Sequence, residues 1–190
     1  MATIYLSTSR LKRDTAIGSS VDDDLLKPQI LLAQDRHILP VLGTKLDDQL
    51  KKLISTNVID QAANAAYKTL LVDYILPALT QFSFVEVAYS LRLRFANNTV
   101  TLPDSEQGSN ASLSDIKIVL DRAEDMAMFY RERLIERLRH HTEDYPEYQA
   151  NTNDDLQPTT RNYFQSLNVY ETKVPDNQRK AFLAAINYRA

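Results

Sequence analysis

The stretch LSDIKIVLDRAEDMAMFYRERLIERLRHH, residues 113–141, decides the fold class. Its apolar side chains recur every three or four residues, which is the spacing of one face of an α-helix. That face comprises Ile116, Val119, Leu120, Ala123, Ala127, Tyr130, Leu134 and Leu138. At about 1.5 Å per residue, the helix is roughly 40 Å long. The stretch therefore predicts a mainly α protein, a helical bundle with a long C-terminal helix.

The other face of this helix is densely charged. It carries Arg131, Glu132, Arg133, Glu136, Arg137 and Arg139. One interpretation is a solvated face with many charge pairs. The other is a contact face toward identical neighbours, and the pattern leaves both open.

Shorter helical runs precede the long helix. The acids Asp22–Asp24 stand before an apolar run, and acids at that place cap a helix. This first helix is expected to end at Leu39–Pro40, because the residue before proline avoids the α region. Thr44 is the predicted cap of a second helix. A third run begins near Asp60, Pro77 kinks or interrupts it, and a fourth run reaches about residue 90.

A short period-two pattern separates the fourth run from the long helix. Leucine and phenylalanine alternate there with Arg92 and Arg94, and Asn97–Asn98 is a typical turn pair. This predicts a β-hairpin over residues 91–102 that packs on a helix or pairs with another chain, because two strands alone are marginally stable in water.

The domain organisation follows from these patterns. Residues 1–20 lack a sustained period and are expected to be an arm that is extended or only locally ordered. Residues 21–148 form the bundle with its hairpin. Residues 149–190 are rich in Asn, Asp, Thr, Gln and Pro, and are expected to be a C-terminal arm with a short terminal helix.

Aromatic residues gather near the C-terminal end of the chain. Six of the ten tyrosines lie at or beyond Tyr130, and tyrosine is enriched at protein interfaces. We therefore predict a protein-interaction surface, although a tail folded back on its own bundle is the alternative. The predicted interface residues are Arg92, Arg94, Tyr145, Tyr148, Tyr163, Phe164, Leu167, Val169 and Tyr170.

Composition disfavours several function classes. The net charge of −3 disfavours a dedicated nucleic-acid binder, and the lack of cysteine excludes thiol chemistry and disulfides. No catalytic, cofactor or metal site is predicted. His37 stands alone, His140 can touch Glu136 four residues before it, and nothing in the pattern brings carboxylates such as Asp125 into a pocket. No membrane span is expected either.

The layout resembles the head–tail connector proteins (adaptor or ring proteins) of tailed phages, and is closest to those of crAss-like phages. The resemblance covers about residues 20–150. It rests on LLAQDRHILPVLG at residues 31–43, the helix to Pro77, the Arg92/Arg94 hairpin with its polar loop, the long helix after Ser112, and YPEY at residues 145–148. These are scaffold features that carry no chemistry.

The resemblance implies a structural virion protein without an active site. It would form a homo-oligomeric ring, expected to be dodecameric, below the portal protein at the head–tail junction. The ring would line the DNA channel, touch the genomic DNA transiently and without specificity, and dock portal, connector and tail proteins. The alternative is a cytoplasmic helical adaptor that binds a single partner. A third hypothesis, which the pattern favours less, is an enzyme with a carboxylate site.

Overall fold

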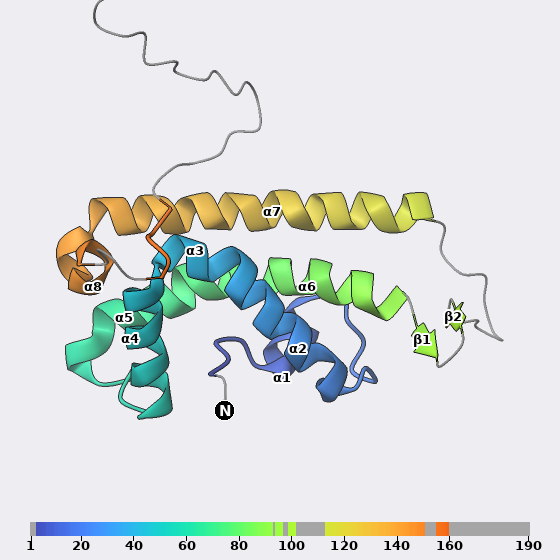
Figure 1. The fold of residues 1–190 in the computed structure, drawn as a ribbon, viewed down its shortest axis with the longest axis horizontal. Helices are drawn as coiled ribbons and strands as arrows, with labels where there is room; N and C mark the ends of the chain where they lie inside the picture. The colour runs from blue at the N-terminus through green and yellow to red at the C-terminus, as the bar shows by residue number, and fades with distance from the viewer. Residues whose placement is uncertain (1–2, 93, 97–98, 102–112, 151–154, 160–190) are drawn as a thin grey trace, which may run out of the picture.

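The computed structural model describes residues 3–92, 94–96, 99–101, 113–150 and 155–159. Helix dominates, so the mainly α class is confirmed. Helix α7 (Leu113–His140) spans the molecule and lies along α6 (Leu76–Arg92) (Figure 1). It is the long helix predicted at 113–141.

Two continuous helical rods, each made of several helical elements, cross beneath α7. Each rod contains a short π-helical segment, which we call a π-turn. The first rod joins α2 (Asp23–Ala33), the π-turn η1 (Gln34–Ile38) and α3 (Leu39–Leu42). The second joins α5 (Ala65–Thr69), the π-turn η3 (Leu70–Ile75) and α6. A short 3₁₀ turn, η2 (Ala62–Asn64), leads into the second rod.

Both π-turns lie directly before a Leu-Pro pair. Leu39 N–H donates to Gln34 O and Leu76 N–H donates to Leu71 O, each across five residues. Proline in a regular helix clashes with a carbonyl four residues back, and the wider turn relieves that clash. The expected helix end at Leu39–Pro40 is therefore wrong, and the second rod runs through Pro77 without interruption. The first rod ends at Gly43, whose φ of 75° favours glycine.

Capping by the acids Asp22–Asp24 is confirmed, with Asp22 as the cap, whereas the cap predicted at Thr44 is wrong. The Asp22 carboxylate accepts the Asp24 N–H at 3.1 Å. Gly43, not Thr44, precedes α4 (Thr44–Ser55). The Thr44 hydroxyl instead accepts the backbone N–H of Leu156 at 3.0 Å.

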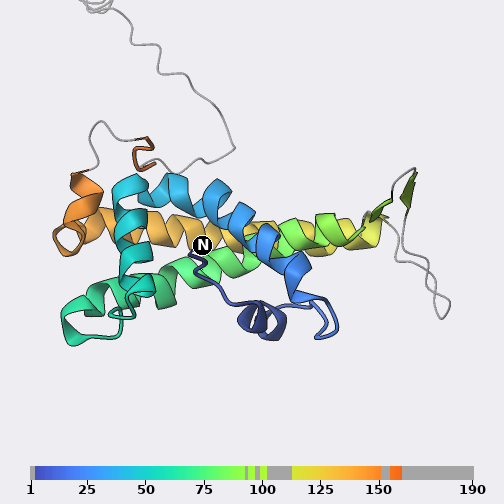
Figure 2. The ribbon, with the colours of Figure 1, turned by 60° about the horizontal axis from the view of Figure 1, so that its bottom comes forward.

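The N-terminal segment belongs to the core, so its assignment as an arm over residues 1–20 is wrong from residue 3 onward. It contains α1 (Thr8–Asp14), which packs against α6 and α2 (Figure 2, dark blue). Its buried side chains are Tyr5, Leu6, Leu11 and Ile17. Only Leu11 lies on α1, and the other three lie in the irregular chain on either side, so no single period revealed them.

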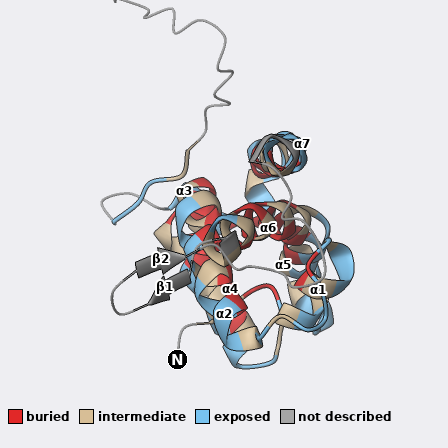
Figure 3. Ribbon diagram, turned by 90° about the vertical axis from the view of Figure 1, so that its right-hand side faces the viewer, coloured by how far each residue is buried: buried red, intermediate tan, exposed pale blue. Residues whose placement is uncertain are grey.

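The core is continuous under the C-terminal half of α7 but thin under the N-terminal half. Leu134, Ile135 and Leu138 belong to the main core. Leu120 and Ala123 form a separate small cluster with Val85 of α6. The N-terminal half of α7 therefore rests on α6 at the edge of the molecule (Figure 3).

The hairpin region contains two three-residue strands, β1 (Arg94–Ala96) and β2 (Thr99–Thr101), which pair antiparallel. Residues 91 and 92, predicted as strand, belong to α6 instead. The turn and the strand side chains lie outside the described part, so the hairpin over 91–102 stays a prediction.

The described part of the C-terminal arm docks back on the bundle. After α7 the chain turns through η4 (Thr142–Asp144) and α8 (Pro146–Gln149). Thr44 N–H donates to Leu156 O at 3.1 Å, and Thr159 N–H donates to Pro40 O at 2.8 Å. Residues 160–190, with the predicted terminal helix, lie outside the described residues.

Among the described residues, one helical run is long and apolar enough to cross a membrane. It is Ala62–Leu91, with a mean hydropathy of 1.4 over its most apolar window. In this fold 61% of that window is buried inside the protein. Burial as the central element of a bundle explains its apolar composition.

Candidate functional site

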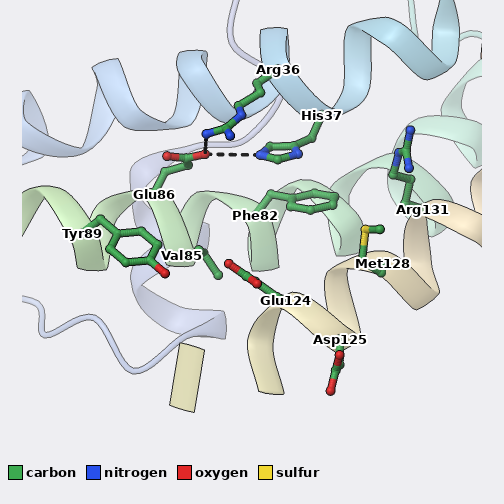
Figure 4. Close-up of a pocket in the computed structure, with 10 residues that line it drawn as sticks. All are labelled: Arg36, His37, Phe82, Val85, Glu86, Tyr89, Glu124, Asp125, Met128 and Arg131. Atoms are coloured by element: carbon green, nitrogen blue, oxygen red, sulfur yellow. Dashed lines mark hydrogen bonds and ion pairs between the residues drawn. The ribbon is translucent and has the colours of Figure 1, made fainter. Parts of the chain in front are cut away.

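A groove opens where η1, α6 and α7 meet (Figure 4). Its volume is about 590 Å³. Charged side chains of both signs line it together with aromatic and aliphatic ones. The lining residues are Arg36, His37, Phe82, Val85, Glu86, Tyr89, Glu124, Asp125, Met128 and Arg131.

The first π-turn positions the basic side of the groove. It presents Arg36 and His37, neighbours in sequence, to one carboxylate of α6. Arg36 Nη1 lies 3.1 Å from Glu86 Oε1, and His37 Nε2 lies 3.2 Å from the same oxygen. Glu86 is only 13% exposed, and its carboxylate is satisfied by the charge of Arg36 and by a hydrogen bond from the His37 ring.

The His37 ring contacts Glu86 at its edge and Phe82 on its face. Its ring stacks on Phe82 with centroids 4.0 Å apart and planes 1° from parallel. Burial lowers the pKa of His37 below its ordinary value, while the Glu86 carboxylate acts in the opposite direction and Arg36 and Arg131 lower it further. The neutral imidazole is therefore favoured.

The facing wall belongs to α7. Glu124 points toward the α6 side of the groove, whereas Asp125 points away from it (Figure 4). The lining holds no serine, cysteine or lysine that could act as a nucleophile. Among the described residues, no group of three His, Cys, Asp or Glu is placed to hold a metal ion. The groove is suited to binding a polar, charged surface.

A second feature lies on the outside of α7. Four large apolar side chains are exposed there, and we name them the α7 stripe: Ile118 (69%), Val119 (52%), Met126 (41%) and Phe129 (61%). At about 100° per residue they fall within one sector about 100° wide. Val119 and Met126 also border a cavity of about 170 Å³ next to Phe84. The sequence pattern predicts Val119 on the buried face, and its exposure shows that this prediction is wrong.

Two predicted interface residues are core residues, so that assignment is corrected. Tyr145 is fully buried and Tyr148 is 7% exposed. The Tyr145 hydroxyl donates to Ala66 O at 3.2 Å, and its ring meets Tyr67 edge-on at 5.7 Å. The turn η4 folds the chain back after α7 and places both rings against the bundle. Enrichment in tyrosine did not distinguish a core position from an interface.

The other predicted interface residues are not brought together by the described structure. Arg92 ends α6 and Arg94 begins β1, and neither side chain is described. The remaining residues lie outside the described part of the chain: Tyr163, Phe164, Leu167, Val169 and Tyr170.

The α7 carboxylates Asp125 and Glu136 lie in different surroundings. Asp125 borders the groove. Glu136 instead pairs with Arg139 at 2.9 Å and with His140 at 3.2 Å. The predicted Glu136–His140 contact is therefore confirmed, and it belongs to the helix surface.

Sequence reasoning missed the pairing of His37 with Glu86, because the two are 49 residues apart and no local pattern links them. It also missed the α7 stripe. The apolar positions of α7 cover more of its circumference than one buried face needs, and that excess was the available indication.

Comparison with protein families shows that the α7 stripe lies inside a matched family region, whereas part of the groove lies outside it. The sequence pattern of DUF6712, a family of unknown function, matches residues 38–156, which is more than half of the chain. The chain belongs to DUF6712. The matched range contains α6 and the whole α7 stripe, but it excludes Arg36 and His37. Curated proteins and solved structures gave no match. The shared DUF6712 region thus extends from the end of η1 to the docked Leu156.

Proposed function

We propose that this DUF6712 protein is a structural virion protein that forms a homo-oligomeric ring, expected to be a dodecamer, in the head–tail connector of a tailed phage. Its place is the head–tail junction below the portal, where it lines the DNA channel. The observation that carries the proposal is the α7 stripe: four large apolar side chains, each 41–69% exposed, on one helix face.

Large exposed apolar side chains gathered on one helix face indicate an interaction surface, because single chains seldom leave a large apolar patch to water. The N-terminal half of α7 packs on α6 through the small cluster of Val85, Leu120 and Ala123, and Thr15 and Ala16 border the cavity beside it. A subunit contact on its outer side would complete its burial. Assembly gives this surface a role that an isolated monomer does not.

The charge of the chain supports passage of DNA. The net charge is −3, and each phosphate contact by Lys or Arg adds affinity for DNA. A wall that is near neutral or acidic lets DNA slide, with transient and non-specific contacts. The proposal needs no cofactor and no catalytic residue.

The C-terminal segment supports docking between subunits. Thr159 is fixed at Pro40, and 31 residues follow it in the sequence, with spaced apolar anchors such as Phe164 and Leu167. At about 3.3 Å per residue, that length spans on the order of 100 Å when extended. It is long enough to reach a neighbouring subunit, the portal or the next ring.

The test is native mass spectrometry of the full chain, alone and with a portal protein. A discrete high-order species close to a dodecamer supports the proposal. Monomer or dimer only, at high concentration and with portal present, contradicts it and favours the alternative, an adaptor that binds a single partner. Electron microscopy of the assembled species would then show whether it is a closed ring.

A further inference from the structure

Helix α7 is packed unequally along its length. Its C-terminal half contributes four fully buried side chains to the main core: Ala127, Leu134, Ile135 and Leu138. Among residues 116–126, the part of the N-terminal half whose side chains the structure describes, only Leu120 and Ala123 are buried. They meet Val85 in the separate small cluster. The N-terminal half is therefore attached by much less buried apolar surface than the C-terminal half.

The small cluster lies between two empty volumes. The groove of about 590 Å³ borders α7 at Glu124 and Met128, and the cavity of about 170 Å³ borders it at Val119 and Met126. At about 100° per residue, these two pairs lie on opposite sides of Leu120 around the helix. Side chains that line a groove or a cavity have fewer neighbouring atoms on that side, so they contribute less dispersion energy.

Polar contacts do not compensate for this limited packing. Within the described part of the chain, no side chain of residues 116–126 forms an ion pair or a side-chain hydrogen bond with another element. The C-terminal half has such contacts. Arg137 pairs with Asp144 at 3.5 Å, and the Arg133 guanidinium lies 4.8 Å from the centre of the Tyr74 ring.

The N-terminal half is also the poorer helix former. Residues 113–126 contain three β-branched residues and three aspartates: Asp115, Ile116, Ile118, Val119, Asp121 and Asp125. Both kinds of residue rank below Ala, Leu, Arg and Glu in helix propensity, and residues 127–140 are rich in those four. Because isolated helices shorter than about 12–15 residues are marginal in water, a detached N-terminal half would lose its helical hydrogen bonds.

We infer that the N-terminal half of α7 opens independently of the bundle: residues 116–126 detach from α6 and unwind, while the C-terminal half stays packed. Local opening of this kind occurs where buried apolar contacts are few. Helix α7 contains neither glycine nor proline, so the change is an unwinding from its N-terminal end and not a bend at a hinge. The inference concerns the single chain and does not depend on the proposed ring.

The opening divides the α7 stripe. Ile118, Val119 and Met126 lie on the half that opens, whereas Phe129 lies on the half that stays packed. A partner that binds the complete stripe would stabilise the closed half, because a ligand shifts a protein toward the state that it binds more tightly. Binding at the stripe and closing of the helix are then coupled.

Hydrogen–deuterium exchange of the full chain, followed by mass spectrometry, tests the inference. The sample is the monomer, isolated by size-exclusion chromatography at low micromolar concentration. Amides of residues 116–126 should exchange about 100-fold faster than those of residues 130–138, after correction for sequence-dependent intrinsic rates.

Urea distinguishes local opening from global unfolding. A concentration of about 1 M should speed the exchange of residues 130–138, which open with the whole bundle, more than that of residues 116–126, whose opening exposes little surface. Equal protection of the two segments, with equal dependence on urea, would show that α7 opens as one unit and would overturn the inference.

Two leucine variants locate the boundary between the halves. Leu120→Ala removes the largest side chain of the small cluster and should speed the exchange of residues 116–126 about tenfold, with the melting temperature unchanged. Leu134→Ala is the matched control, since it truncates the same side chain in the main core and should lower the melting temperature. Equal losses of melting temperature in both variants contradict separate opening. If Leu134→Ala fails to fold, the milder Ile135→Val replaces it, and the urea series on the unmodified chain decides without either variant.

Discussion

The hydroxyl of Tyr5 donates to the carboxylate of Asp47 at 2.6 Å, which ties the N-terminal segment to α4. Asp47 is 2% exposed and also pairs with Lys51 at 2.6 Å. Burial and the nearby Asp47 charge raise the pKa of Tyr5 far above its ordinary value, so the phenol keeps its proton and remains a donor. The bond is one of the contacts that hold this segment, which lacks periodicity, against the core.

Tyr5→Phe should destabilise the fold by about 1.5–3 kcal/mol, because it removes a hydrogen bond to a buried charge. For a chain of this length, that corresponds to a drop in melting temperature of several degrees, on the order of 2–4 °C per kcal/mol. Tyr67→Phe is the control, since its hydroxyl bonds Glu147 at 2.7 Å in a less buried place. Equal effects of both variants would contradict the special role of Tyr5.

His37 makes stability depend on pH. Its pKa is lowered by burial, so the unfolded chain binds a proton more readily than the folded one. The stabilisation is complete above the ordinary value of about 6.5 and is lost as pH falls below it. His37→Gln should flatten the dependence of the unfolding free energy on pH between about 5 and 7, measured by urea denaturation. An unchanged slope in the His37→Gln variant would contradict this role of His37.

Tyr145 tests whether the YPEY segment is core or interface. Tyr145→Ala should cost about 3–5 kcal/mol, as for other large-to-small core changes. Tyr145→Phe should cost about 1 kcal/mol, through the lost bond to Ala66. Phe129→Ala, at an exposed ring, should stay within about 0.5 kcal/mol. A melting temperature for Tyr145→Ala close to that of the unmodified protein would favour the prediction that Tyr145 lies at a protein interface.

Two truncations separate docking of the tail from its role in assembly. Deletion of residues 160–190 should leave the melting temperature unchanged and weaken assembly. Deletion of residues 151–190 should also remove the bonds of Leu156 and Thr159 to Thr44 and Pro40. That loss should lower stability by about 1–3 kcal/mol. Unfolding of the shorter deletion would show that residues 160–190 belong to the core.

Arg92→Ala with Arg94→Ala should weaken binding to the portal more than it lowers stability. The two positions join the end of α6 to β1. Arginine is mostly exposed in folded proteins, and changes at exposed positions usually stay within about 0.5 kcal/mol. Thermal melting and portal binding by surface plasmon resonance measure the two effects. A large drop in melting temperature with unchanged binding would assign these arginines to the fold.

Local patterns predicted the helices well because their causes are local. The Asp22 cap and the long helix of residues 113–140 depend on residues no more than four positions apart. The errors also have local causes. A Leu-Pro pair indicates a helix end, but a π-turn before it lets the helix continue, and nothing in the short pattern around Pro40 revealed that turn.

The candidate site could be predicted only in part. The excess of apolar side chains on the long helix is visible in the sequence, but which of them are covered depends on α6 lying beneath one side. Val119 shows this, since it shares a helix with buried Leu120 and is itself 52% exposed. The meeting of His37 with Glu86 depends on how two distant rods cross.

Sequence patterns predict the class of the fold, the position of its main helices and the lack of thiol chemistry, because periodicity, caps and composition act through neighbouring residues. The burial of the N-terminal segment and of Tyr145, the contact of His37 with Glu86 and the exposure of one face of α7 could be seen in the folded chain alone. These properties come from contacts between residues far apart in the chain, and their free energy depends on the packing of whole helices.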